Sequence, residues 1–320
     1  MTDDAAIRRH RRRLAIPVAI AVLLLGGYTM LWFQGARIMR TEIARWVAAE
    51  RAEGRTVAYG DVRVRGYPGS LRAEVEAPVW ADPGAWAWRA ERLFVITEPF
   101  DPRRLVLTPR GEQRAEYGGG AYALRADDLR VGLEEGAVTV EMAGLTAEDA
   151  AAGDVAASDG ARTLAIGAGR AAWSEGPGGA GVLGLSFGQV AYADGEAAYY
   201  VPQLNAALSE VAGRDLGLDA FEGAVATAKG APAALIAGQG RLTIGDDGYP
   251  AGRLDVTVRN ADALSAVLIQ AGVLDAAQGG MVDMAMGMFG SGEGEATLPL
   301  SAQDGALRVG PVAVADLPRF

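Results

Sequence analysis

The sequence contains no Cys and a single His, His10, which precedes the first long hydrophobic run. Without Cys no disulfide framework can form, so packing alone must hold the fold in an oxidising compartment. The part of the chain after that run has neither an imidazole nor a thiol. It therefore cannot build a Ser-His-Asp triad, a Cys nucleophile or an imidazole metal site. We accordingly predict no catalytic residue, no metal ligand and no cofactor.

Basic residues are also few. The chain has 30 Lys and Arg against 40 Asp and Glu. Residues 1–33 hold five Arg and two Asp, which leaves 25 basic and 38 acidic residues after them, a net charge of −13. Nucleic-acid affinity comes largely from neutralising phosphates, so this charge argues against a nucleic-acid partner. It also argues against flat binding to anionic lipid headgroups.

A run of twenty residues without a charge, Leu14–Phe33, dominates the N-terminal region. A helix needs about 20 apolar residues to cross a bilayer. No small-x-small cleavage site follows promptly, so an uncleaved anchor is favoured over a signal peptide. Amphipathic rings near the end of the run suit a membrane interface. The residues predicted to form the anchor include Leu14, Val18, Leu23, Leu24, Leu25, Tyr28, Trp32 and Phe33.

Arginines immediately before this run predict the orientation of the anchor, because basic residues beside a first hydrophobic segment stay in the cytoplasm. We therefore expect a single-pass protein of the inner (cytoplasmic) membrane with a cytoplasmic N-terminus and a periplasmic C-terminal domain. The arginines concerned are Arg8, Arg9, Arg11, Arg12 and Arg13.

Periodicity after the anchor predicts four segments: a cytoplasmic basic segment at 1–13, a transmembrane helix at 14–33, a juxtamembrane helix at 34–53 and an exported β-rich domain at 54–320. Strict alternation, as in Leu71–Ala77, is typical of strands with one buried face. Short turns with Gly recur between alternating runs and favour hairpins. The predicted fold is mainly β, an elongated, curved antiparallel meander with two helical inserts, preceded by one transmembrane helix. The turns concerned are Glu135-Gly136, Asp194-Gly195, Asp246-Asp247-Gly248 and Asp304-Gly305.

The two helical inserts are predicted from apolar spacing. Residues 202–212 have Leu204 and Leu208 four apart after a Pro, which fits a helix. Residues 260–289 form the longer insert, which Gly279-Gly280 is expected to divide in two. A Gly-rich and Ala-rich segment at 150–160 is a candidate loop.

The segment Gly66-Tyr67-Pro68-Gly69-Ser70-Leu71 resembles an uncharacterised, membrane-anchored envelope family of Gram-negative bacteria, catalogued as a domain of unknown function. Further matches are the aromatic-rich Trp80–Trp88 stretch, the Leu254–Asn260 strand before a helix, and the closing hairpin Leu298–Leu307. The resemblance covers most of the exported part and carries over no functional residue. The layout is also similar to larger envelope proteins whose long curved sheet shields lipid chains, which is an architectural analogy.

Several motifs have two interpretations. Gly167-Ala168-Gly169 matches a loose dinucleotide fingerprint, but the fingerprint needs a following helix, and a hairpin turn is favoured. Asp127-Asp128 and Asp246-Asp247 suit turns better than a calcium site. The methionines at 281, 284, 286 and 288 suit helix packing better than copper. Trp80, Trp86 and Trp88 suit a buried aromatic cluster better than a sugar platform.

Three functions remain open at this point. The first is a non-enzymatic protein whose sheet shelters or transfers lipid or acyl chains. The second is a structural or assembly partner of another envelope protein, and the third is a hydrolase that uses carboxylates alone. For the first, the residues expected to face lipid are those in the buried phase of two strands, namely Leu71, Val75, Leu254 and Val256.

Overall fold

The structure is a computed structural model that describes residues 3–98, 101–149, 162–176, 180–193, 198–210, 215–271, 274–289, 295–309 and 312–317. It is mainly β, as predicted. Within the described residues three helices, α1 (Asp3–Ala52), α2 (Ala261–Gln270) and α3 (Ala276–Phe289), accompany 18 strands of one sheet. The strands are β1 (Thr56–Ala58), β2 (Val62–Arg65), β3 (Leu71–Glu76), β4 (Val79–Asp82), β5 (Trp86–Glu98), β6 (Asp101–Tyr117), β7 (Gly120–Arg125), β8 (Asp128–Glu134), β9 (Ala137–Asp149), β10 (Thr163–Glu175), β11 (Gly181–Ala193), β12 (Ala198–Ser209), β13 (Asp215–Ala226), β14 (Ala233–Ile244), β15 (Pro250–Arg259), β16 (Glu295–Gln303), β17 (Ala306–Val309) and β18 (Val312–Asp316).

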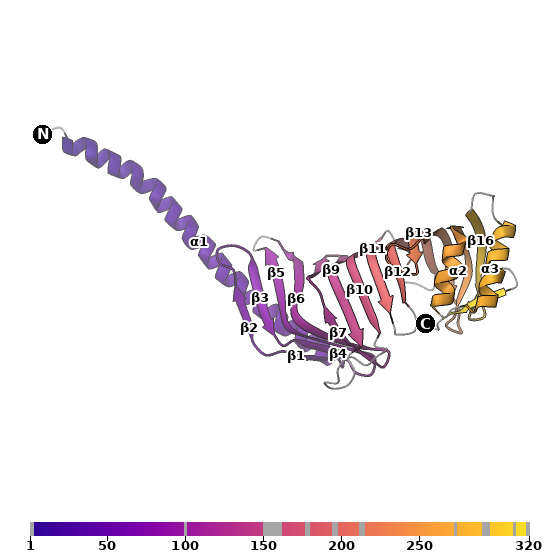
Figure 1. Cartoon of the computed structure of the whole chain (residues 1–320). Coiled ribbons are helices and arrows are strands. Elements are labelled where there is room, and N and C mark those ends of the chain that lie inside the picture. The colour runs from indigo at the N-terminus through magenta and orange to yellow at the C-terminus, as the bar shows by residue number, and fades with distance from the viewer. Residues whose placement is uncertain are drawn as a thin grey trace.

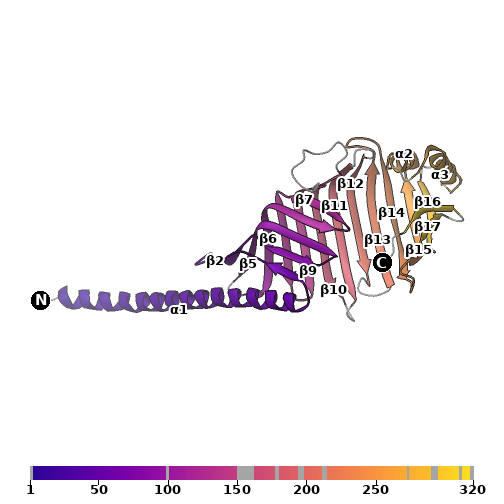
Figure 2. The ribbon, with the colours of Figure 1, turned by 90° about the horizontal axis from the view of Figure 1, so that it is seen from below.

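Helix α1 is continuous over its 50 residues. At 1.5 Å per residue it is about 75 Å long. Its N-terminal part stands away from the sheet and its C-terminal part lies against it (Figures 1 and 2). The predicted helix at 34–53 is therefore confirmed as the second half of one longer helix. In the described part of the chain, no helix meets the combined length and hydropathy of a membrane-crossing segment.

The sheet is an antiparallel meander over most of its length, which confirms the predicted architecture. From β8 onward each strand pairs with the next one in the chain as far as β18. The hairpins β8–β9, β14–β15 and β16–β17 turn at the predicted positions. The predicted turn at Asp194-Gly195 and loop at 150–160 lie outside the described residues. The sheet extends as a curved row of strands from α1 to α2 and α3 (Figure 1).

The alternation of side chains breaks along one line that crosses four strands. The register places Gly144, Gly167, Gln189 and Pro202 opposite one another in β9 to β12, and none of them forms a ladder pair. Gly144 and Gln189 have positive φ angles of 56° and 55°. Across this line the apolar positions are spaced by three residues instead of two. We call this line the crease.

Two predictions made from the sequence are wrong for residues at or near the crease. The helix predicted at 202–212 is wrong, because residues 202–209 belong to strand β12. The turn predicted around Gly167 is also wrong, because that glycine lies inside β10, and no helix follows it to support the dinucleotide alternative. A Cβ at Gly169 would lie 2.8 Å from the Phe187 ring and 2.9 Å from Met142 Cγ. This glycine therefore makes room for its cross-strand neighbours.

The helical insert at 260–289 is present, but its break is not at Gly279-Gly280. Both glycines lie inside α3, and the interruption falls between Gln270 and Ala276. Asp275 and Gln278 exchange two side-chain to backbone hydrogen bonds, 2.7 and 2.8 Å long, which form a capping box at the start of α3. A Cβ at Gly279 would lie 2.5 Å from Ile269 Cδ1. The glycine thus permits close packing of α3 on α2.

Candidate functional site

One face of the sheet is apolar along nearly its whole length. Residues that are directly paired on neighbouring strands share a face of the sheet. The pairing therefore defines three parallel rows of side chains that cross twelve strands, from β3 to β16. We call these rows the apolar stripe. The central row contains Ala73, Val95, Leu107, Val131, Val140, Ala171, Leu185, Ala206, Phe221, Gly238, Val256 and Leu298.

The two flanking rows have the same character. Thr97 is the only polar side chain among them, and no member is charged. One row contains Leu71, Thr97, Leu105, Leu133, Val138, Trp173, Leu183, Leu208, Leu218, Gly240, Leu254 and Leu300. The other contains Val75, Leu93 and Pro109 in β3 to β6 and continues from β8 with Leu129, Met142, Gly169, Phe187, Leu204, Gly223, Ile236, Val258 and Ala296, although the ladder between β6 and β8 itself ends at Leu107 and Val131.

The opposite face of the same strands is charged near α1. Asp128 of β8 pairs with Arg130 at 2.9 Å and with Arg110 of β6 at 3.5 Å. Farther along, Arg170 of β10 lies 3.8 Å from Glu141 of β9. These pairs are exposed, and exposed ion pairs contribute little to stability. The alternation of an apolar with a charged face nevertheless identifies the stripe as the face whose side chains favour cover from water.

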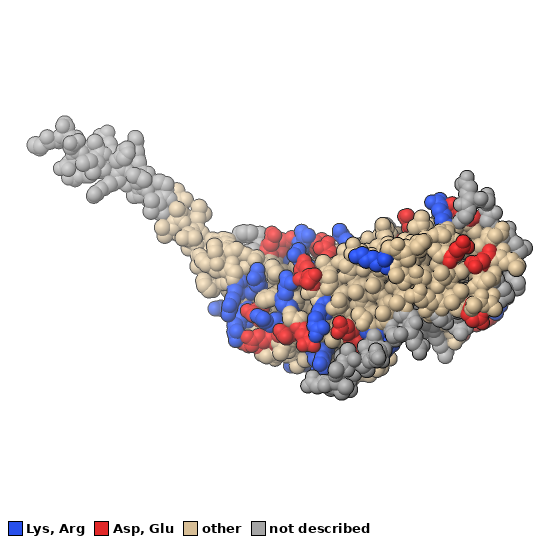
Figure 3. All heavy atoms as spheres, viewed as in Figure 1, with Lys and Arg blue, Asp and Glu red and all other residues tan. Residues whose placement is uncertain are grey.

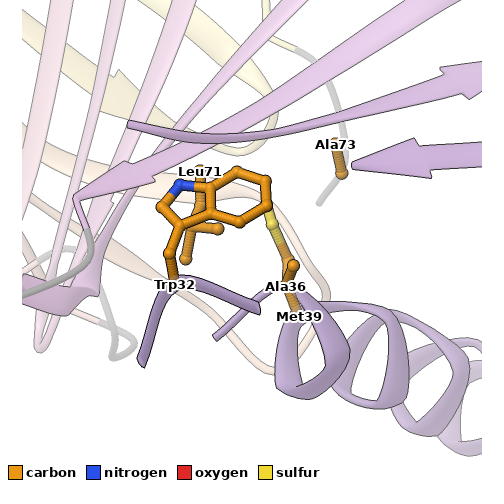
Figure 4. Close-up of a cluster of buried hydrophobic side chains, with 5 residues drawn as sticks. All are labelled: Trp32, Ala36, Met39, Leu71 and Ala73. Carbon is orange, nitrogen blue, oxygen red and sulfur yellow. The ribbon is translucent and has the colours of Figure 1, made fainter. Parts of the chain in front are cut away.

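Helices cover the apolar stripe at its two ends. At one end Trp32, Ala36 and Met39 of α1 form a buried cluster with Leu71 and Ala73 of β3. The Trp32 indole lies against Leu71 in this cluster (Figure 4). At the other end α2 and α3 lie over the stripe, where Met286 is buried against β15 and β16. That cluster contains Val256, Val258, Met286, Ala296 and Leu298, with Leu264 and Val282 packed against it.

The middle of the stripe has no such cover. Among the described residues between Ala90 and Ala226, Pro109 of β6 is the only apolar side chain that is buried. Leu185, Phe187 and Trp173, for example, are only half-buried. Helices α1, α2 and α3 make their described sheet contacts at strands β1 to β4 and β12 to β16. Strands β8 to β11 therefore present the apolar stripe without a covering layer in the described structure.

Polar contacts fix the C-terminal end of α1 to the sheet. Glu50 accepts hydrogen bonds from Arg55 at 2.5 and 3.1 Å and from the Trp80 indole N–H at 3.0 Å. The Arg55 bond is the main cause that lowers the pKa of Glu50, and desolvation opposes it. Arg51 donates two hydrogen bonds to the carbonyl of Val57, at 2.9 and 2.6 Å. The helix is thus fastened by its last turn as well as by its apolar side.

The predicted aromatic cluster is present but only partly buried. Trp80 packs edge-on against Trp46 of α1, with ring centroids 5.5 Å apart, and against Trp86 at 5.0 Å. Trp80 is 36% and Trp46 44% exposed. Trp88 donates its indole N–H to Gln113 at 3.2 Å. These rings join α1 to β4 and β5 and do not form an open platform.

The four residues predicted to face lipid share the apolar stripe. Leu71 and Leu254 lie in the same flanking row, Val75 lies in the other, and Val256 lies in the central row. Leu71, Val75 and Val256 are buried and Leu254 is half-buried. The structure therefore places these residues at the covered ends of the face, and the half-buried residues of its middle were not singled out from the sequence.

The predicted anchor residues lie on α1. Leu23, Leu24, Leu25 and Phe33 are each at least 60% exposed. Trp32 is instead buried against β3. The side chains of residues 1–19 lie outside the described part of the structure, and with them Leu14, Val18 and the five predicted topology arginines.

Of the four methionines in α3, two side chains are described. Met286 is buried in the cluster beneath the helix, whereas Met284 is 69% exposed. Met281 and Met288 have side chains outside the described residues. For the described part of the chain, no group of His, Cys, Asp and Glu side chains suited to a metal ion is present.

The chain belongs to a bacterial family of unknown function. Residues 32–318 match the family described as "Uncharacterized protein conserved in bacteria (DUF2125)". No curated protein matches the chain, and no solved structure matches it. The family membership confirms the resemblance to an uncharacterised bacterial family, and the match begins at Trp32, one of the residues of α1 that pack against β3.

Proposed function

We propose that this chain is a membrane-anchored protein of the bacterial cell envelope that shelters acyl chains of lipids on its apolar stripe. The observation that carries the proposal is the uncovered middle of the stripe. Soluble monomers rarely expose contiguous apolar patches of more than a few hundred Å², and larger ones mark interaction or ligand surfaces. A half-buried, uncharged surface between two helix-covered ends suits an apolar ligand that lies along the sheet.

The dimensions of the stripe suit an extended ligand. Strands in a sheet lie about 4.8 Å apart, so twelve strands span roughly 50 Å. The hydrocarbon core of a bilayer, which holds two layers of acyl tails, is about 30 Å thick. The stripe therefore has length for more than one acyl chain. Thr97, the one polar side chain in the three rows of the stripe, is buried, and its hydroxyl donates a hydrogen bond to the carbonyl of Asp101 at 3.0 Å.

The anchor is the second part of the proposal. Supporting it, residues 14–33 carry no charge, five arginines precede them, and the apolar side chains of α1 from Ile20 to Leu25 are largely exposed on the described helix. A reporter that is active only in the cytoplasm, fused after Phe320, should give no signal. A strong cytoplasmic signal would contradict the proposed periplasmic location.

The sheltering activity can be tested in the middle of the stripe. Leu185→Asp places a carboxylate in the central row, where it remains hydrated but repels an acyl chain. Ser186→Asp is the matched control, because Ser186 is the next residue of β11 and faces the opposite side. The full chain carrying each substitution would be purified in mild detergent, and its retained lipid quantified by mass spectrometry. We expect Leu185→Asp to lower the retained lipid several-fold and Ser186→Asp to leave it unchanged.

The alternative is that a partner protein, rather than lipid, covers the same surface. A photo-reactive residue at position 185 would form cross-links in cells with whatever covers the stripe. Lipid adducts support the proposal. Cross-links to one protein, together with equal lipid retention by the two Asp variants, would replace it by the assembly role.

A further inference from the structure

Two arginines face each other beside the turn that joins β2 to β3. Arg65 and Arg72 are directly paired across the strands. Like charges in this position are destabilising. Neither forms an ion pair with any residue that the structure describes, although Arg63, on the same face of β2, pairs with Asp61 at 2.9 Å and Glu76 at 2.8 Å. In a chain with a net charge of −10, this local excess of positive charge requires an explanation.

The two arginines line a pocket of about 550 Å³. Arg92, Phe94, Ser70, Gly66 and Gly69 complete much of its wall. Glu74 also lines it and lies 3.8 Å from Arg92, so three guanidinium groups face one carboxylate. Basic and acidic side chains both gather on the part of the molecule next to α1, whereas the middle of the visible face carries few charged side chains (Figure 3).

The pocket adjoins the segment of α1 where the uncharged run ends. The Thr29 hydroxyl lies 2.8 Å from the Tyr67 hydroxyl, and the Trp32 indole N–H donates to the carbonyl of Gly69 at 3.3 Å. Tyr67 also stacks on Phe33, with ring centroids 6.2 Å apart. Aromatic rings of this kind mark the interface of a membrane protein, where the lipid headgroups lie. The turn therefore holds the pocket at that level of the helix.

We propose that the pocket of Arg65, Arg72 and Arg92 binds the phosphate of an anionic phospholipid headgroup in the membrane that holds α1. Guanidinium groups bind phosphate oxygens bidentately, and an anion between Arg65 and Arg72 removes their mutual repulsion. The negative charge of the rest of the domain opposes general adhesion to an anionic surface, so recognition is confined to this pocket. The inference rests on the proposed membrane anchor.

The test compares lipids that differ in headgroup charge. The full chain, purified in a non-ionic detergent, would be titrated with phosphatidylglycerol, phosphatidylcholine or inorganic phosphate, and bound molecules counted by native mass spectrometry. The double variant Arg65→Gln/Arg72→Gln should lose at least about tenfold in affinity for phosphatidylglycerol, equivalent to about 1.4 kcal/mol, because it removes two guanidinium groups that would bind the phosphate. Its affinity for phosphatidylcholine should not change. Arg65→Lys/Arg72→Lys, which keeps the charge without the fork, should lose less.

The matched control is Arg103→Gln/Arg104→Gln, which removes two exposed arginines of β6 that pair with Glu135 and Glu134. It should bind phosphatidylglycerol like the parent, and both double variants should keep the melting temperature of the parent. Equal affinity of the parent for both lipids would overturn the assignment. Binding of inorganic phosphate without phosphatidylglycerol would overturn the membrane source of the anion.

The pocket assignment and the sheltering proposal can be refuted separately. Leu185→Asp should lower the total retained lipid and preserve the preference for phosphatidylglycerol. If that variant retains as much lipid as the parent, the sheltering proposal fails, and the headgroup preference of the parent still decides the pocket. If the preference is absent while Leu185→Asp loses lipid, the pocket assignment alone is overturned.

Discussion

The ends and the middle of the apolar stripe have the same pattern in the sequence and different surroundings in the structure. Ala73 and Val256 at the ends and Leu185 in the middle belong to one row of the sheet. The first two are buried beneath helices, and the third is half-buried with no helix over it. Alternation of apolar residues therefore shows which face of a strand avoids water. It does not show whether the protein itself or a ligand supplies the cover.

The largest expected effect separates the covered end from the open middle. Val256→Asp places an unpaired carboxylate under α3 and should lower the free energy of unfolding by about 3–5 kcal/mol. Leu185→Asp, in the same row, should cost far less because its carboxylate stays hydrated. Denaturant unfolding of both variants measures the difference, with the exposed Ala251→Asp of β15 as the control for Val256. Equal losses at positions 185 and 256 would mean that the middle is as well covered as the end.

The next effect tests the cover supplied by α1. Trp32→Ala removes the ring that packs on Leu71 and should destabilise by about 3 kcal/mol, typical of a buried Trp replaced by Ala. Leu31→Ala is a suitable control, since the neighbouring Leu31 is 61% exposed. Hydrogen exchange should become faster in α1 and β3 of the Trp32 variant alone. Unchanged protection of β3 would show that α1 does not cover this end in solution.

A smaller effect concerns the fastening of α1 by Glu50. The pKa of Glu50 in the folded chain lies below its ordinary value of 4.5, chiefly because Arg55 donates hydrogen bonds to it. A lowered folded pKa contributes stability above the unfolded pKa, and that stability is lost as the pH falls through the folded pKa. Glu50→Gln should therefore reduce stability at neutral pH and weaken the acid dependence below about pH 4. Parallel pH–stability curves for variant and parent would contradict this role.

The smallest effect lies in the open middle. Gly169→Ala introduces a Cβ within 2.9 Å of Phe187 and Met142 and should cost about 1 kcal/mol, since both neighbours can move. Gly184→Ala is the control, because the nearest atom to its Cβ would be 3.9 Å away. Thermal unfolding of the two variants gives the comparison. A loss of several kcal/mol at position 169 would indicate a rigid, tightly packed middle.

Much of the fold could be predicted from the sequence, because strand alternation and hairpin turns are local signals. The meander, its turns and the common face of Leu71, Val75, Leu254 and Val256 follow from them. The helix at 202–212 was wrong because residues four apart, such as Leu204 and Leu208, fit both a helical and a strand period. The nearby crease, which interrupts the alternation at Pro202, removed the signal that would have decided.

The candidate site could be predicted only in part, since cover is a long-range property. Nothing local in β3 indicates that Trp32, 39 residues before Leu71, packs on it. The start of α3 could have been predicted from the sequence, because Asp275 and Gln278 have the spacing of a capping box. The arginine pocket required the register of β2 on β3, which brings Arg65 opposite Arg72.

The continuity of α1 has a consequence for orientation. A domain joined to its anchor by a flexible, Gly-rich and Ser-rich linker samples many directions, whereas a continuous helix transmits its own direction. In this chain the helix passes from its exposed N-terminal part to its contacts with β3 and β4 without an interruption. The orientation of the long axis of the sheet therefore follows the tilt of α1. In the anchored state that we propose, β2 and β3 lie near the bilayer surface. Helices α2 and α3, at the other end of the sheet, then keep a fixed position relative to that surface.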